Sequence, residues 1–132
     1  MLNDAIQIAH TVREWAEDLA GREKREATLA GMCAIASAKL SHLLNKKAIK
    51  NEIAMATDNT WCHVFVLVED HIIDVTATQF ANFKDQRVVV LHEKEAAGCW
   101  FHEVRYRFND YKALRRKQRA DRWPSNQIVR LK

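Results

Sequence analysis

The feature that most constrains the fold is a run of apolar residues broken once by two acidic ones. Residues 61–68 read WCHVFVLV, Glu69 and Asp70 follow, and residues 71–76 read HIIDVT. Aromatic and β-branched residues on both sides of a two-residue polar break are typical of a β-hairpin. We therefore predict two antiparallel strands, 61–68 and 71–76, joined by a turn at Glu69-Asp70.

This turn also predicts which side chains share a face of the hairpin. With Glu69-Asp70 as the turn, position 65 lies opposite position 74, and His63 becomes a diagonal neighbour of Asp74 on the same face. A register shifted by one residue would place the two side chains on opposite faces. The prediction that His63 and Asp74 meet therefore depends on the position of the turn.

The first 45 residues have helical rather than strand periodicity. Apolar residues at three- and four-residue spacing predict a first helix over 3–19, with Asn3 as its N-cap and Gly21 at its end. A second helix is expected from Thr28 or Gly31 to Leu44. Its residues are small and apolar on almost every side, which is typical of a buried helix with other elements packed closely around it.

The rest of the chain completes an α+β fold within a single domain, residues 1–132. Further strands are expected over 49–55 and 87–91 and, on a weaker pattern, over 100–108. A basic helix then begins at Asn109 or Asp110 and is cut off by Pro124. The expected architecture is N-terminal helices, the second of them buried, packed on an antiparallel sheet of four or five strands, followed by a C-terminal basic helix.

Composition excludes several classes of protein. The 132 residues are 48% hydrophobic and 29% charged with only three Gly and one Pro, which argues against low-complexity and collagen-like chains. No apolar run approaches the 18 residues of a membrane span, and the N-terminus carries Asp4 and no basic segment, unlike a secretory signal. Three cysteines without a CxxC motif fit a reduced chain, so we expect a cytosolic protein.

Three residues carry the chemistry that nucleophilic catalysis needs. Cys33 lies near the N-terminus of the buried helix, where backbone amides and the helix dipole stabilise a thiolate. His63 can take the thiol proton and return it to the leaving group, and Asp74 can fix the imidazole tautomer. Each residue alone also fits a structural role: Cys33 as core packing and His63 as an ordinary histidine. Asp74, inside a strand after two isoleucines, needs a partner if it is buried.

The segment GMCAIAS, followed by the hairpin WCHVFVLVEDHIIDVTATQF, resembles the transglutaminase-like branch of the papain-like cysteine enzymes. That superfamily carries Cys on a buried helix, His on the first following strand and Asp on the next, in this chain order. The match runs from Gly31 to Phe80. His63 and Asp74 are only 11 residues apart, closer than in many members, and the chain is near the smallest size for the fold.

The resemblance implies amide chemistry through a thioester on Cys33. The outcome would be hydrolysis of a peptide or amide, deamidation of glutamine, or acyl transfer to an amine, with a protein or peptide carrying an amide or glutamine side chain as substrate. We expect no cofactor. The oxyanion would be stabilised by the Cys33 N–H and by a side chain, for which Gln79 and Asn59 are candidates. Trp61 either lies over the site or anchors packing.

The remaining candidates are weaker. Cys62 is adjacent to His63, points to the other face of the strand and is expected in the core. Cys99 and His102 have a Cys-x2-His spacing but no second ligand pair, so we expect no metal site. Ser37 is expected to pack the helix.

The C-terminal charge run supports an alternative of a different class. Residues 112–122 hold six of the 21 Lys and Arg residues, in a chain of net charge +4. Such a run is usually a solvated helix face, but it also suits a non-catalytic binding module of the same fold that holds an acidic protein or nucleic acid. The residues in question are Arg115, Arg116, Lys117, Arg119 and Arg122.

Overall fold

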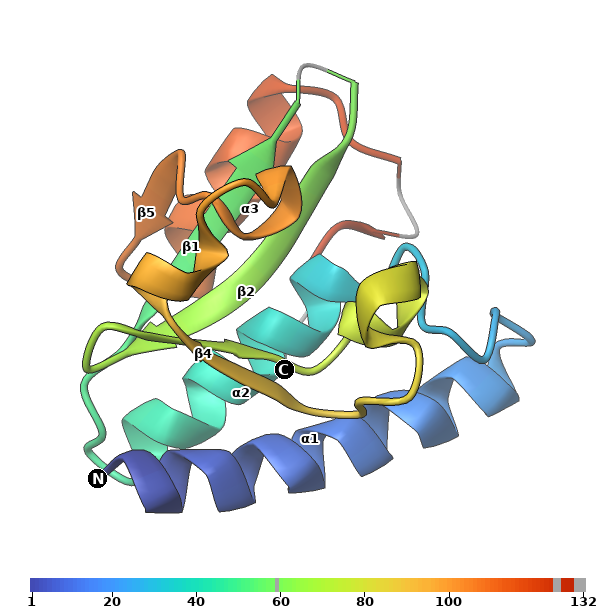
Figure 1. Ribbon diagram of the computed structural model, residues 1–132. Coiled ribbons are helices and arrows are strands. Elements are labelled where there is room, and N and C mark those ends of the chain that lie inside the picture. The colour runs from blue at the N-terminus through green and yellow to red at the C-terminus, as the bar shows by residue number, and fades with distance from the viewer. Residues whose placement is uncertain (59, 125–126, 130–132) are drawn as a thin grey trace.

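The computed structural model describes residues 1–58, 60–124 and 127–129 and has the expected α+β class (Figure 1). The α-helices are α1 (Leu2–Arg22), α2 (Cys33–Lys46) and α3 (Tyr111–Ala120). The strands are β1 (Glu52–Thr57), β2 (Cys62–Val68), β3 (His71–Asp74), β4 (Val89–His92) and β5 (Tyr106–Phe108). Short 3₁₀ turns lie between them: η1 (Ala77–Gln79), η2 (Ala81–Phe83), η3 (Glu93–Ala96) and η4 (Trp100–His102).

The five strands form one antiparallel sheet in the order β4-β3-β2-β1-β5. Val68 pairs with His71 and Val66 with Ile73, so the register predicted from the turn is confirmed. Glu69 and Asp70 both have positive φ values, +49° and +64°. Two positive φ values are what a two-residue turn needs to match the twist of its strands.

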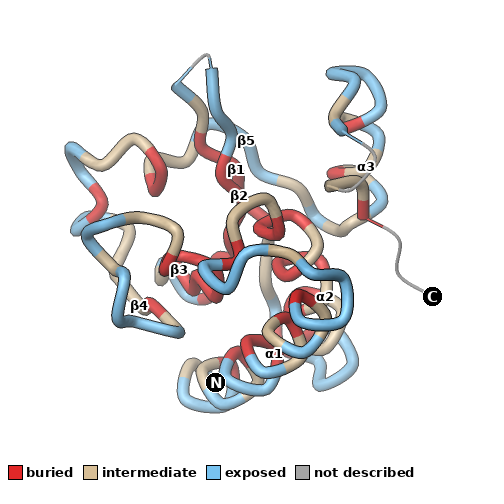
Figure 2. The backbone as a smooth tube through the Cα atoms, turned by 90° about the vertical axis from the view of Figure 1, so that its right-hand side faces the viewer, coloured by how far each residue is buried: buried red, intermediate tan, exposed pale blue. Residues whose placement is uncertain are grey.

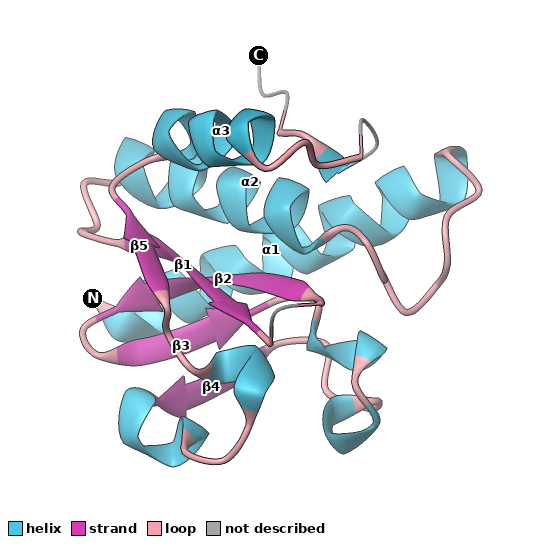
Figure 3. Ribbon diagram, turned by 90° about the horizontal axis from the view of Figure 1, so that it is seen from above, coloured by secondary structure: helices cyan, strands magenta, loops and turns pink. Residues whose placement is uncertain are grey.

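The sheet is covered on both faces. Helices α1 and α2 pack against one face, where Val66, Val68 and Ile73 join their small and aliphatic residues in a core (Figure 3). The opposite face carries Phe65 and Ile72 and is covered by the segment from η3 to η4, whereas α3 packs beside α2 on the first face. Buried residues gather where α1 and α2 meet the sheet, while the outer side of α1 is exposed (Figure 2). Residues of β2 thus have buried neighbours on both sides.

The helix boundaries differ from the sequence prediction in ways that backbone geometry explains. Helix α2 begins at Cys33, later than expected, because Leu29 and Gly31 adopt left-handed conformations with φ of +64° and +81°, which a right-handed helix excludes. Helix α1 starts after Met1, so Asn3 is inside the helix and does not cap it. None of the helices in the described part of the chain is both long and apolar enough to span a lipid bilayer.

The strand expected over 100–108 is wrong for its first half. Residues Trp100–His102 form a 3₁₀ turn, and only Tyr106–Phe108 pair with β1. The basic helix begins where expected, because the Asp110 carboxylate accepts the Ala113 N–H at 2.9 Å.

Candidate active site

Cys33 is the first residue of α2 and is only 7% exposed. Small residues on α2 allow the helix to approach the sheet closely, and the Ser37 hydroxyl donates to the Val64 carbonyl at 3.0 Å, as its expected packing role requires. This bond ties the first turns of α2 to β2. Cys33 therefore lies at the end of a helix whose position is fixed relative to the hairpin.

His63 is the second residue of β2 and is buried, with 1% of its surface exposed. The pairing of β2 with β3 ends at Val66 and Ile73, so the start of β2 pairs only with β1. The imidazole consequently lies at an opening in the sheet next to the end of β3. Phe80 packs edge-on against it, with ring centroids 4.7 Å apart.

Asp74 is the last residue of β3 and is equally buried. Its Oδ2 lies 2.6 Å from His63 Nε2, and its Oδ1 accepts the Thr76 N–H at 2.9 Å. The Thr76 hydroxyl donates to the same Oδ1 at 3.4 Å. The carboxylate is therefore held on both oxygens, and the meeting of His63 and Asp74 has the diagonal geometry that the hairpin register predicts.

The two buried groups shift each other's protonation. Burial would lower the pKa of His63, but the charge and hydrogen bond of Asp74, with a further contribution from Cys33, raise it to about 10. Burial would raise the pKa of Asp74, but the charge of His63 and hydrogen bonds from His102 and His63 hold it well below its usual range. The pair therefore favours an imidazolium and a carboxylate at neutral pH.

The imidazole of His63 interacts with both predicted partners. Asp74 occupies Nε2, and Cys33 is near enough to help raise the His63 pKa, so Nδ1 is the nitrogen that remains available to the thiol. Gln79 Nε2 lies 3.5 Å from this Nδ1 and 3.0 Å from the Thr76 carbonyl oxygen. An imidazolium adjacent to a cysteine sulfur stabilises the thiolate, which is the nucleophilic form.

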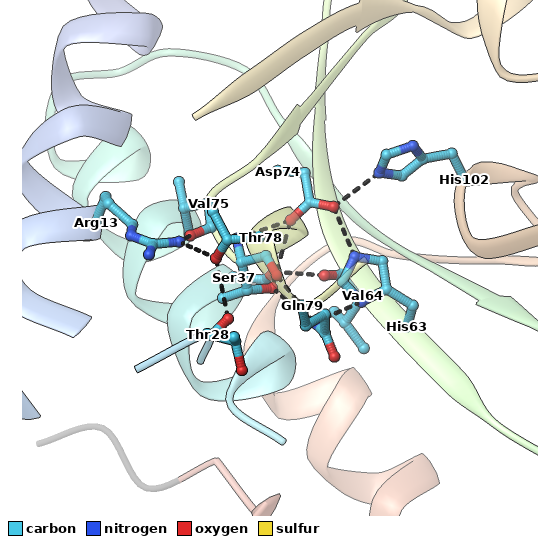
Figure 4. Close-up of polar contacts among 11 residues, drawn as sticks. Arg13, Thr28, Ser37, His63, Val64, Asp74, Val75, Thr78, Gln79 and His102 are labelled. Carbon is cyan, nitrogen blue, oxygen red and sulfur yellow. Dashed lines mark hydrogen bonds and ion pairs between the residues drawn. The ribbon is translucent and has the colours of Figure 1, made fainter. Parts of the chain in front are cut away.

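A second histidine, His102, completes the group around Asp74 (Figure 4). His102 Nε2 lies 2.7 Å from Asp74 Oδ2, the oxygen that His63 also contacts, and the ring is 1% exposed. The sequence analysis considered His102 only as a zinc ligand with Cys99. Its place beside Asp74 has no signal in the local sequence, because η4 is a short irregular turn 28 residues further along the chain.

Arg13 of α1 supports the segment that follows Asp74 and was also missed (Figure 4). Arg13 is 3% exposed, and its guanidinium donates to the Val75 carbonyl at 3.0 Å and to the Thr78 hydroxyl at 2.8 Å. Thr78 in turn donates to the Thr28 carbonyl at 3.0 Å. These bonds join α1, the loop before Cys33 and the loop after Asp74, so they fix the two halves of the site relative to each other.

A cleft of about 390 Å³ opens over Cys33. Gln79, Trp61 and Trp123 line it, and Trp61 is 67% exposed, so Trp61 borders the site instead of anchoring the core. Arg122 and Gln127 from the C-terminal segment form part of the same wall. Asn59, the other expected oxyanion donor, lies outside the described residues.

Cys62 corrects one expectation, because it is exposed and lines this cleft instead of lying in the core. As the first residue of β2 it lies at the end of the sheet, beyond the part that α2 covers. The cleft therefore contains two thiols, of which Cys33 and not Cys62 contributes to the raised pKa of His63.

His63, Asp74 and His102 are the one group in the described part of the chain whose ligand atoms, all within 4.8 Å of one another, could reach a single metal ion. Both imidazoles, however, direct Nε2 at the same Asp74 oxygen at hydrogen-bond distance. The described residues supply no fourth side-chain ligand, and His102 Nδ1 has no partner among them to orient it, as a metal-bound histidine needs. We therefore interpret the group as a hydrogen-bond network.

Comparison of the chain with protein-family models, curated proteins and solved structures finds no match. The resemblance to transglutaminase-like enzymes therefore stays a prediction, and the functional argument depends on the site itself.

Proposed function

We propose that the protein is a cysteine-dependent enzyme that acts on amides through a thioester, with Cys33 as nucleophile, His63 as acid and base, and Asp74 as the orienting carboxylate. The observation that carries the proposal is the central position of His63. Its Nε2 is 2.6 Å from Asp74, and Cys33 lies close enough to help raise the pKa of the same imidazole. All three are buried beside a cleft that Cys33 lines.

The geometry supports a simple sequence of steps. The Cys33 thiolate attacks the amide carbonyl carbon and forms a C–S bond. The His63 imidazolium then gives its Nδ1 proton to the leaving nitrogen as the C–N bond breaks, releasing an amine or ammonia and leaving a thioester. Water or an amine then gives a proton to His63 and attacks the thioester carbonyl carbon. The C–S bond breaks, which releases the acid or the new amide and leaves Cys33 as the thiolate beside the His63 imidazolium. Throughout, the His63 Nε2–H donates a hydrogen bond to Asp74.

Two groups near Cys33 suit the developing oxyanion. The Cys33 N–H is in the first turn of α2, where backbone amides have no acceptor within the helix. The Gln79 amide lines the same cleft and is held in place by its bond to Thr76. A cleft of about 390 Å³ suits one side chain of a protein or peptide, such as glutamine, better than a long extended substrate.

The order of Cys33 on a helix, His63 on β2 and Asp74 on β3 supports a papain-like, transglutaminase-like core for this α+β fold. The three free thiols suit a reducing compartment, and we place the enzyme in the cytosol. Neither the reaction steps nor the core invokes a cofactor.

The test is iodoacetamide labelling of Cys33 as a function of pH, followed by mass spectrometry. Because an imidazolium is present beside it, Cys33 should label at nearly constant rate from pH 6 to 8. Exposed Cys62 is the internal comparison, because labelling of a thiol that is mostly protonated rises about tenfold per pH unit. His63→Ala should make the labelling of Cys33 depend on pH as that of Cys62 does.

Turnover is tested with a casein substrate, by ammonia release and by incorporation of a fluorescent amine. Cys33→Ala should abolish both while changing the free energy of unfolding by about 1 kcal/mol or less, and Cys62→Ala should retain activity. Labelling of Cys33 that follows the pH dependence of Cys62 in the wild type would contradict the assignment of the nucleophile.

One observation favours a second candidate function, binding of a polyanion or acidic protein by α3. Arg116, Arg119 and Arg122 are exposed and have no ion pair with any described residue. The other two basic residues of the expected set are engaged: Lys117 pairs with Asp121 at 3.0 Å, and Arg115 is half-buried. The basic face is therefore smaller than the sequence suggests.

Binding to a duplex DNA probe distinguishes this alternative. With three free arginines we expect weak binding whose log affinity falls with log salt at a slope of about −3 or less in magnitude. Replacing Arg116 and Arg119 by Gln should reduce the slope, whereas Lys24→Gln and Lys84→Gln, on other loops, should leave it nearly unchanged. Tight binding that salt does not weaken would favour a dedicated nucleic-acid role.

A further inference from the structure

The carboxylate of Asp74 is shared by two imidazoles. His63 Nε2 and His102 Nε2 lie 2.6 and 2.7 Å from the same Oδ2, and all three side chains are buried. We infer that His102 is a positioning residue of the proposed active site, a hydrogen-bond donor that acts on His63 through Asp74. This inference rests on the proposed function for its meaning in turnover, but its physical content can be measured without a substrate.

The surroundings of His102 determine which nitrogen carries the proton. Nε2 faces a carboxylate oxygen, so it must donate. Nδ1 is buried and has no hydrogen-bond partner among the described residues. A buried N–H without an acceptor is destabilising, so Nδ1 carries no proton. The ring is thus held as the Nε2–H tautomer, packed edge-on against Phe65 and Phe101 at centroid distances of 5.3 and 5.0 Å.

His102 completes the hydrogen bonding of the carboxylate. Oδ1 accepts the Thr76 N–H and hydroxyl, and Oδ2 accepts the two imidazole N–H groups. A carboxylate has about four acceptor sites, so each one is used. Asp74 therefore cannot rotate without breaking a buried bond, and the Nε2–H of His63 is held in one direction.

The second hydrogen bond to Oδ2 also affects how strongly Asp74 stabilises the imidazolium form of His63. A hydrogen bond from His102 withdraws charge from Oδ2, so the carboxylate stabilises the His63 imidazolium less than it would alone. The titratable groups that contact His63 are Cys33 from α2 and Asp74 from β3, and the His102 ring from η4 is 5.8 Å away by centroids. Without His102, His63 becomes a weaker acid toward the leaving nitrogen.

The experiment compares His102→Phe, which removes the donor, with His102→Gln, whose amide N–H can reach a position close to that of Nε2. The His63 pKa is measured by NMR in a Cys33→Ala background, so that the thiol does not titrate with it. We expect His102→Phe to raise that pKa by about 0.5 to 1 unit, the equivalent of one hydrogen bond, and His102→Gln to restore most of the change.

In otherwise wild-type enzyme, His102→Phe should affect the alkylation of Cys33 and the release of ammonia from casein differently. Alkylation of Cys33 needs only the thiolate and should stay within about twofold in His102→Phe. Release of ammonia from casein needs proton transfer from His63 and should fall about tenfold, by the same hydrogen-bond equivalent. Phe83→Leu, which removes an aromatic neighbour of His102 without touching Asp74, controls for lost packing and should leave the His63 pKa unchanged.

The wild-type protein provides a readout that needs no variant to fold. Two strongly downfield Nε2 protons bonded to a buried carboxylate should appear in the imidazole ¹H–¹⁵N spectrum, and His102→Gln should remove one of them. A single such proton, or an Nδ1–H on His102, would overturn the inference. So would a His63 pKa that is the same in wild type and His102→Phe, or one bound zinc per chain that His102→Phe loses. If no casein activity exists but two protons and the pKa shift are found, the proposed function fails and the network stands.

Discussion

Replacing Asp74 by Asn removes the charge of the buried network while keeping its shape. The amide nitrogen can only donate, yet the side chain it replaces accepts bonds on both oxygens. If the nitrogen takes the place of Oδ1, the Thr76 N–H is left buried without an acceptor. If it takes the place of Oδ2, both imidazoles must present a bare Nε2, which moves the proton of His63 to Nδ1 and gives His102 an Nδ1–H with no acceptor among the described residues.

Either arrangement leaves at least one buried donor unsatisfied and breaks the ion pair with His63. We expect the free energy of unfolding at pH 7 to fall by about 3 kcal/mol, between the cost of one unsatisfied donor and that of a broken buried pair. The pKa of His63 should fall from about 10 to below its ordinary 6.5, because burial then acts without the carboxylate. Turnover should drop by about 10- to 1000-fold, less than the roughly 10⁴-fold of a serine triad, since a thiol ionises more readily.

The assays are urea unfolding, the His63 titration by NMR, and iodoacetamide labelling of Cys33 at pH 7. Asp70→Asn is the matched control, because it makes the same substitution in the exposed turn of the same hairpin. It should change none of the three measurements appreciably. A His63 titration that is the same in wild type and Asp74→Asn would show that the two residues are not paired in solution, and the proposed triad would then be wrong.

Three further predictions concern stability. The pKa of His63 is raised on folding, so its contribution to the free energy of unfolding should be complete below about pH 6.5 and be lost as the pH rises toward 10. In this window the free energy of unfolding from urea should fall by up to about 1.4 kcal/mol per pH unit, and Asp74→Asn should lack this slope. Arg13→Met should lower the free energy of unfolding by about 2–4 kcal/mol by removing a buried donor, and the same change at exposed Arg22 should cost under about 0.5 kcal/mol. Gly31→Ala should cost about 1–2 kcal/mol in thermal unfolding, because φ of +81° strains any residue with a Cβ.

Local sequence was sufficient to predict the hairpin and half of the candidate site. The two-residue turn between two apolar runs determines the register, and the register alone places His63 and Asp74 on one face. The N-terminal helices and the cap at Asp110 are also local, because each depends on residues within a few positions of one another.

The limits of the local patterns were set by backbone conformation. Helical periodicity suggested that α2 begins at Thr28 or Gly31, but left-handed residues at Leu29 and Gly31 delay its start to Cys33. Aromatic and apolar residues at 100–108 suggested one strand, but only the last three of them pair with β1 and form the edge of the sheet. Periodicity indicates which secondary structure a segment can form, but the backbone conformation and packing of neighbouring segments determine how much of the segment forms it.

Tertiary packing decided the rest of the site. Cys33 meets His63 because α2 packs where β3 ends and the start of β2 is open, and Cys62 is exposed because the sheet extends past its helical cover. Arg13 and His102 reach the network from 62 and 28 residues away, from a helix and an irregular turn whose own sequences carry no sign of it. The hairpin is determined by sequence because its contacts are adjacent in the chain, whereas the surroundings of Asp74 are determined by the fold because a buried charge takes its donors from whichever segments the packing brings to it.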